Sequence, residues 1–493
     1  MRHAVCLSSL LGIAAVGLLA GCPDRSVSKP DVSQGRVEYK DIPVTVNRDI
    51  DILFIIDDSP SMLDKQTNLK ANFPNFINVL NTIEGGLPNV HIGVTTSDLG
   101  SKGADDASPG PGIGTGPGMC SGNGKAGNLQ TYGSTAITGT YISDIKDNTG
   151  MRQTNYTGTL SDAFTAIASA GANGCGFEQH IEAAKRALNN NPANAGFLRQ
   201  DAYLAIIIVG DEDDCSMSHS TLIGGGDGSP LGPLQSFRCT RFGIICDQGG
   251  ADSNAMNQIG PKGMCHSADD GVYLTKIPDY VNFFKGLKAD PNSVIVAAIA
   301  GVTTPFEVEL RAPVGSTQQI PALTHSCTYT DSGGGTEVAD PAVRFKQLID
   351  SFPNRSTFST ICQQDLSGGL QLIAELLKAV IGSPCVDGTL ADADPNTPGT
   401  QYDCSVSDVT NYGKTNQMET VLPECNNLTP GSEASSTNKP CWAIETDMAN
   451  CSSGQHLTLK IERDQAPPPD DHVISYCVTC TDANMDGVCD PAM

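Results

Sequence analysis

The strongest constraint on the fold of this chain is the repeated alternation of short apolar runs with segments of helical periodicity. Residues 50–56 form a nearly continuous apolar run, and residues 204–209 and 294–299 repeat the pattern. Runs of this kind are typical of parallel strands that are covered on both faces. Apolar residues recur at helical spacing over residues 69–83 and 366–380. The alternation predicts an α/β fold: a doubly wound, mostly parallel sheet with helices on both faces.

Composition divides the chain into a large domain and a smaller one. The alternation of strands and helices covers residues 49–383 and is interrupted at about residues 99–150, 215–270 and 302–340, which are rich in Gly, Ser, Thr, Pro or Cys. Loops this long are uncommon inside a compact domain, so we interpret them as insertions. Residues 384–493 lack helical periodicity and contain eight cysteines, which predicts a small disulfide-rich β-type domain.

The first residues of the chain have the features of an export signal. Arg2 precedes an apolar run at residues 10–20, which is too short to span a bilayer comfortably. The run ends in Leu-Ala-Gly-Cys, whose last residue is Cys22, and this sequence resembles the lipobox of bacterial lipoproteins. The resemblance implies that residues 1–21 are a signal peptide, that Cys22 is lipidated, and that residues 22–48 are a lipid-anchored tether. An ordinary signal peptide with a nearby cysteine is the alternative.

Cysteine content and charge limit the location and the partners of the mature chain. The chain has eighteen cysteines, which indicates an oxidising compartment. Loss of Cys6 with the signal peptide and lipidation of Cys22 would leave sixteen, an even number compatible with a complete set of disulfides. The formal net charge of −25 argues against nucleic-acid binding, which requires basic patches. We expect a bacterial cell-envelope protein, anchored by lipid in the outer membrane.

A candidate metal site follows the first apolar run. Asp57, Ser59 and Ser61 form the pattern D-x-S-x-S at the point where the predicted strand at residues 50–56 gives way to a helix. Carboxylate and hydroxyl oxygens that converge at such a turn suit a hard cation such as Mg²⁺. Ser and Asp are also good helix caps, so capping is the alternative explanation, and both can hold together.

At this motif the chain resembles the von Willebrand factor type A domain, whose metal-ion-dependent adhesion site begins with D-x-S-x-S. The resemblance covers roughly residues 49–383. It implies that both serines bind Mg²⁺ or Mn²⁺ directly, that Asp57 binds directly or through water, and that an Asp after the fourth strand completes the site. Asp211, which closely follows the apolar run at residues 204–209, occupies that position. An acidic solvated loop is the alternative for Asp211.

The sequence departs from this family at the loop before the third helix. The family places a Thr there, but residues 171–178 contain none. Glu178 is the candidate substitute ligand, and a first-turn acid favoured by the helix dipole is the alternative. His180 is expected on a solvated helix face. Cys175 and Cys215 lie in the two loops that should flank the site, and we hypothesise a disulfide between them, with pairing to an insertion cysteine as the alternative.

The resemblance implies recognition of a partner and no enzymatic turnover. In this family the open coordination position of the metal accepts a carboxylate from a protein or other macromolecular ligand. The insertions at residues 99–150 and 215–270 would then form the specificity surface, because binding residues concentrate on loops held by rigid scaffolds. A structural envelope protein whose cations only stabilise loops is one alternative. A metal-dependent hydrolase ranks last, because no general base occurs at a recognised spacing.

A second candidate cation site lies near the C-terminus. The sequence from residue 482 matches the first half of an EF-hand-like calcium loop and also resembles the short calcium loops of thrombospondin type 3 repeats. The final ligand position falls on Met493, which chelates poorly, and an acidic turn is the alternative. The candidate Ca²⁺ ligands are Asp482, Asn484, Asp486 and Asp490.

Overall fold

The structure is a computed structural model of the chain. The described residues before position 385 are 36–43, 49–83, 86–147, 151–227, 229–248, 254–313 and 316–381. Beyond it they are 385–386, 388–392, 401–412, 415–426, 436–448, 451, 455–464 and 471–480. The candidate lipidation site Cys22 and the candidate calcium ligands Asp482, Asn484, Asp486 and Asp490 lie outside the described residues.

A seven-stranded, mostly parallel sheet forms the centre of the large domain, in the order β15-β10-β6-β2-β3-β4-β5. Its strands are β2 (Asp49–Ile56), β3 (Asn89–Thr96), β4 (Ile142–Lys146), β5 (Arg152–Thr154), β6 (Tyr203–Val209), β10 (Val294–Ala300) and β15 (Ser356–Thr360). The five strands from β15 to β3 run parallel. β4 is antiparallel to β3, and β5 is antiparallel to β4.

Helices cover both faces of this sheet. Successive side chains of a strand point to opposite faces, and in β2 Phe54 packs with one set of helices while Leu53 and Ile55 pack with the other. The first set is α1 (Leu63–Asn81), α2 (Leu160–Ile167) and α7 (Ser367–Ile381). The second set is α3 (His180–Leu188), α5 (Ile277–Lys285) and α6 (Val343–Asp350). This double cover explains why β2, β6 and β10 are apolar without alternation.

The predicted mixed α/β fold with a mostly parallel sheet is confirmed. The three apolar runs form β2, β6 and β10, and the segments of helical spacing form α1 and α7. The expected insertion at residues 99–150 is too long, because its last part is β4, which pairs with β3 and β5 in the central sheet. The region at residues 302–340 contains four short strands: β11 (Glu307–Arg311), β12 (Ile320–Leu323), β13 (Cys327–Thr330) and β14 (Thr336–Ala339).

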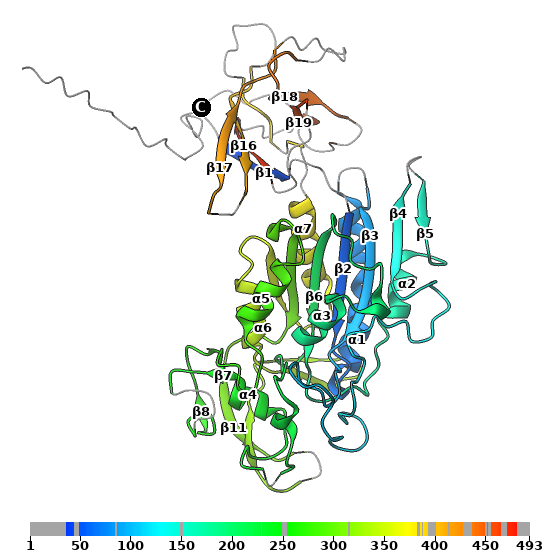
Figure 1. Cartoon of the computed structure of the whole chain (residues 1–493), viewed down its shortest axis with the longest axis vertical. Coiled ribbons are helices and arrows are strands. Elements are labelled where there is room, and N and C mark those ends of the chain that lie inside the picture. Colours follow the sequence, from blue (N-terminus) through cyan, green and yellow to red (C-terminus); the bar gives the residue numbers. More distant parts are fainter. Residues whose placement is uncertain are drawn as a thin grey trace, which may run out of the picture.

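The C-terminal region forms separate β-structure that includes a segment from the N-terminal part of the chain. Its four-stranded sheet has the order β1-β20-β16-β17 and is antiparallel throughout. Its strands are β1 (Arg36–Pro43), β16 (Cys404–Thr410), β17 (Met418–Leu422) and β20 (His472–Thr479). All eight residues of β1 pair with β20, so the expectation of a simple tether at residues 22–48 is wrong for this segment. β1 is an edge strand of this sheet, next to β20, and the sheet lies beyond the end of the central sheet (Figure 1).

Disulfides close separately within the two regions. The four bridges of the large domain are Cys120–Cys175, Cys215–Cys239, Cys246–Cys265 and Cys327–Cys362. They use all eight cysteines between residues 49 and 383. Three bridges of the C-terminal region are Cys385–Cys451, Cys404–Cys477 and Cys425–Cys441, and Cys480 is also disulfide-bonded.

Candidate functional site

The candidate site lies where the order of strands in the central sheet reverses. β2 and β6 are neighbours, and the chain proceeds outward from β2 to β3 on one side and from β6 to β10 on the other. In open α/β sheets, ligands bind beyond the carboxyl ends of the strands at such a point. Asp57 follows β2 directly, and Asp211 follows β6 after one glycine. The amide of Asp57 donates to the carbonyl of Val209 at 2.9 Å, which joins the two strand ends.

The carboxylate of Asp57 is completely buried at this crevice. Its Oδ1 atom accepts hydrogen bonds from the amide of Ser59 at 2.7 Å and from the hydroxyl of Ser97 at 3.3 Å. Its Oδ2 atom has no hydrogen-bond partner among the described residues, and the Nε2 atom of His180 is 3.5 Å away. A buried carboxylate oxygen without a donor is unfavourable, and the chemistry of the Oδ2 atom fits that of a cation ligand.

The hydroxyls of the motif connect Asp57 to Asp211. The Oγ atoms of Ser59 and Ser61 lie 3.1 Å apart, and Ser61 donates to Oδ1 of Asp211 at 3.1 Å. Neighbouring oxygens around an octahedral Mg²⁺ are also about 3 Å apart. Ser59 is the N-cap residue of the short 3₁₀ helix η1 (Pro60–Met62) but makes no side-chain capping hydrogen bond. Helix capping therefore does not explain the orientation of the Ser59 side chain. The oxygen atoms of Asp57, Ser59, Ser61 and Asp211 fit the ligand preference of a small divalent cation.

Lys65 of α1 brings a positive charge to the same site, although it lies outside the D-x-S-x-S motif. Its ammonium lies 3.1 Å from Oδ2 of Asp211, 2.5 Å from Oε2 of Glu337, and 3.1 Å from the carbonyl of Ser61. Burial lowers the pKa of Lys65, but the charges of Asp211 and Glu337 outweigh it and the pKa is raised. The position of Lys65 one helical turn after Ser61 is the sequence signal that would have pointed to it.

Two carboxyl groups at the site have strongly raised pKa values. Burial, with the charge of Asp57 adding to it and the charge of Lys65 opposing it, raises the pKa of Asp211 to about 6. Burial, then the charges of Asp98 and Asp57, raises the pKa of Asp58 to about 8. Both shifts arise mainly from burial, which disfavours the ionised form of each carboxyl group, and a bound cation would favour that form.

The structure brings Glu178 close to the site but turns it toward another carboxyl group. Glu178 is buried and precedes α3, so it is not a first-turn acid of that helix. Its side chain hydrogen-bonds that of Glu212. Burial and the charges of Glu212 and Asp57 raise the pKa of Glu178 well above its usual range. His180 is also fully buried and packs edge-on against Phe345 at 5.0 Å, so the expectation of a solvated His180 is wrong.

The hypothesised disulfide between Cys175 and Cys215 is wrong. Cys175 pairs with Cys120, and Cys215 pairs with Cys239. Each partner belongs to a long insertion, so the alternative of pairing with insertion cysteines holds at both positions. The bridges attach the insertions to the loops before α3 and after β6, and they place insertion residues beside the motif. Gly118 accepts a hydrogen bond from the amide of Gly176 at 3.0 Å.

In the described residues, the candidate site is not built from charged or thiol side chains alone. Among these residues, no three or more His, Cys, Asp or Glu side chains form a cluster suited to a metal ion. The candidate site therefore depends on the serine hydroxyls as well as on Asp57 and Asp211. In the same part of the chain, the helices are all too short or too polar to cross a membrane.

Comparisons with known proteins identify no family. No protein-family description matches the sequence, and no curated protein matches it. Among solved structures, BatB from Bacteroides thetaiotaomicron is 9% identical, with 67% of this chain and 98% of that chain covered and a TM-score of 0.25. The pilus adhesin SpaC from Lactobacillus rhamnosus GG is 11% identical over 91% of this chain and 41% of that chain, with a TM-score of 0.27. The pilus adhesin RrgA from Streptococcus pneumoniae is 12% identical over 90% and 58% of the two chains, with a TM-score of 0.21. At these TM-scores the similarities carry no argument about fold or function.

Proposed function

We propose that this protein is a cell-envelope lipoprotein that binds a protein or other macromolecular partner through a divalent cation held at the switch point of the sheet. In this proposal Cys22 carries the lipid that anchors the chain in the outer membrane. The large domain is of the von Willebrand factor A type, and it binds without enzymatic turnover.

The observation that carries the proposal is the convergence of four oxygen-bearing side chains at the ends of β2 and β6. Asp57 offers a buried oxygen without a donor, and Ser59, Ser61 and Asp211 form a chain of 3.1 Å contacts beside it. These four residues would hold Mg²⁺ or Mn²⁺, with Glu178 as a further candidate on the neighbouring loop. The cation would supply a Lewis-acidic coordination position for a carboxylate of the partner.

The position of the insertions supports recognition by the surrounding loops. The insertions gather around the carboxyl ends of the strands, at the end of the large domain opposite the C-terminal sheet (Figure 1). Glu337 of β14 contacts Lys65, and Gly118 of another insertion lies against Pro60 of the motif. The insertions thus line the approach to the proposed cation, where they would select the partner.

The test measures cation binding and partner capture in the same variants. Asp57→Asn keeps the size of the side chain and removes the charge, so it should abolish binding of Mn²⁺ measured by electron paramagnetic resonance. It should also abolish Mg²⁺-dependent capture of envelope proteins. Asp279→Asn, at an exposed acid in the first turn of α5, is the matched control and should leave both unchanged. Mn²⁺ binding that survives Asp57→Asn would refute the proposed site.

A structural envelope protein is the second candidate function, and Lys65 favours it. Its ammonium already neutralises part of the charge on Asp211, so the loops have an internal cation. If chelation or Asp57→Asn lowered the melting temperature but left partner capture unchanged, the structural function would replace the adhesive one.

A further inference from the structure

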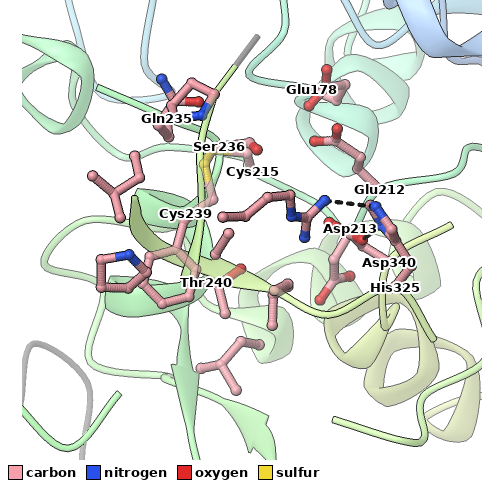
Figure 2. A pocket seen from close by; sticks show the side chains of 18 of the residues that line it. Glu178, Glu212, Asp213, Cys215, Gln235, Ser236, Cys239, Thr240, His325 and Asp340 are labelled. Atoms are coloured by element: carbon pink, nitrogen blue, oxygen red, sulfur yellow. Dashed lines mark hydrogen bonds and ion pairs between the residues drawn. A yellow bond between two sulfur atoms is a disulfide. The ribbon is translucent and has the colours of Figure 1, made fainter. Parts of the chain in front are cut away.

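A cavity of about 350 Å³ lies beside the candidate cation site. It is formed between the acidic loop that follows β6 and the insertions, which contribute α4 (Phe237–Gly243), β7 (Ile244–Ile245) and β12. A volume of this size is typical of a site that encloses a small ligand or a large side chain. Figure 2 shows the cavity with the carboxyl groups of Glu178 and Glu212 next to each other at one side.

Apolar residues of the insertions also line the cavity. Phe237 and Ile244 come from one insertion, and Ile320, Pro321 and Leu323 come from another. A cavity lined by both apolar residues and carboxyl groups is complementary to a side chain with an aliphatic stem and a cationic end. Lysine and arginine have this form, and both bury their stems along apolar surface.

Three of the five acids that line the cavity already have a partner on Arg344 or His325. Asp214 pairs with the guanidinium of Arg344 at 3.1 Å, and Asp213 accepts from the backbone amide of Arg344 at 2.9 Å. Asp340 contacts Nδ1 of His325 at 2.7 Å. Arg311 also lines the cavity, but its Nη1 atom is engaged by Nε2 of His325 at 2.6 Å.

Glu178 and Glu212 are the exceptions. Their side chains hydrogen-bond each other, and in the part of the chain that the structure describes neither forms an ion pair with a lysine, arginine or histidine. The lining as a whole contains five carboxyl groups and two guanidinium groups, so its acidic groups outnumber its guanidinium groups. A cationic ligand would supply the missing partner for this pair of glutamates.

We propose that this cavity receives a lysine or arginine side chain of the macromolecular partner. The stem packs between Phe237 and Pro321, and the cationic end lies at Glu212 and Glu178. This proposal depends on the proposed function in one respect, which is that the side chain is assigned to a macromolecular partner. The formal net charge of −25 would favour approach of a partner with a basic surface.

The test uses two capped tripeptides, acetyl-Ala-Lys-Ala-amide and its norleucine counterpart, with the full mature protein. Norleucine has an apolar side chain of similar length without the ammonium. Titration followed by saturation-transfer NMR should give at least tenfold tighter binding of the lysine peptide. Glu212→Gln should weaken the lysine peptide at least fivefold and leave the norleucine peptide unchanged.

Two further variants keep the test decisive. Ala322→Phe fills the cavity without altering its charges and should abolish binding of the lysine peptide. Asp279→Asn, at an exposed acid on α5, should have no effect. Equal affinity for the two peptides, binding that survives Ala322→Phe, or equal weakening by Asp279→Asn and Glu212→Gln would each overturn the proposal.

Mn²⁺ binding measured on the same samples separates this inference from the proposed function. A wild-type protein that binds the lysine peptide but no Mn²⁺ would refute the cation site and retain the cavity. A protein that binds Mn²⁺ but does not distinguish lysine from norleucine would refute the cavity and retain the cation site. Ala322→Phe should leave Mn²⁺ binding unchanged, because Ala322 is not among the proposed cation ligands.

Discussion

The ammonium of Lys65 lies 3.1 Å from the carboxylate of Asp211, and both side chains are almost completely buried at the candidate cation site. The same ammonium contacts Glu337 of β14. One positive charge is therefore already built into a site that is proposed to receive another. Lys65 stabilises the site when no divalent cation is bound, and its charge opposes the binding of a divalent cation.

We expect Lys65→Met to have opposite effects on stability and on cation affinity. Without divalent cations, the variant leaves Asp211 buried without its ionic partner, which typically costs about 3–5 kcal/mol. With Mn²⁺, loss of the repulsive charge should tighten binding by about tenfold, which corresponds to about 1.4 kcal/mol. Melting temperatures in EDTA and Mn²⁺ titrations measure the two effects. Lys70→Met, in the same helix but more exposed, is the control.

The stabilising effect of Mg²⁺ should depend on pH. The pKa of Asp211 is raised to about 6 from an ordinary value of 3.8, so without a cation the folded state retains a proton that the unfolded state loses. This contribution to stability is present below about pH 4 and is lost as the pH rises through about 6. A bound cation favours the ionised form and reverses the effect.

The measurement compares the melting temperature of the protein in Mg²⁺ with its melting temperature in EDTA, at several pH values from 4.5 to 8. The difference should be small at pH 4.5 and should grow as Asp211 ionises. Asp211→Asn should remove the pH-dependent part of this difference. A difference that is constant with pH would show that Asp211 is not a ligand.

The disulfide between Cys120 and Cys175 should stabilise both the fold and the candidate site. It closes a loop with a sequence separation of 55 residues. Chain-entropy arguments assign about 4 kcal/mol to a loop of this length. Replacing both cysteines by Ser should lower the midpoint of urea unfolding and weaken Mn²⁺ binding, because the loop before α3 loses its attachment.

The double replacement of Cys246 and Cys265 is the matched control. This bridge closes a shorter loop, with a sequence separation of 19 residues, and lies within an insertion. Its loss should cost about 3 kcal/mol by the same argument and should leave Mn²⁺ affinity unchanged. Equal effects of both pairs on Mn²⁺ affinity would contradict a specific role for Cys175.

Removal of β1 should destabilise the C-terminal sheet. β1 pairs with β20 along all eight of its residues, so a chain that begins at residue 46 exposes the edge of β20. An exposed edge strand promotes aggregation. We expect this truncation to aggregate on heating and to be cleaved faster by protease in its C-terminal region, whereas a chain that begins at residue 30 behaves as the full protein. Equal behaviour of the two truncations would contradict the pairing.

Much of the central sheet was predictable because its strands have a strong local signal. β2, β6 and β10 are buried on both faces, and that environment favours apolar residues along most of each strand. β4 and β15 lack this signal, because they lie toward the edges of the sheet and combine polar with apolar residues. β1 was expected to be part of a tether, because a short polar segment between prolines contains no information about the distant strand β20 with which it pairs.

The residues of the candidate site also differ in whether the sequence alone could identify them. Asp57, Ser59 and Ser61 were recognisable because they are close in sequence, and Asp211 because it closely follows a buried strand. The roles of Lys65 and Glu212, and the pairing of Cys175 with Cys120, depend on contacts between segments that are distant in sequence. Short-range patterns contain no information about such contacts.

The sequence by itself determined the alternation of strands and helices, the acidic and cysteine-rich character of the chain, and the D-x-S-x-S motif. These depend on local periodicity and on residue type. Only the tertiary structure decided that β1 joins the C-terminal sheet, that Lys65 stands beside Asp211, and that Glu178 meets Glu212 in a cavity. Each of these is a long-range contact, and the path of the whole chain sets which distant groups share one buried, weakly screened environment.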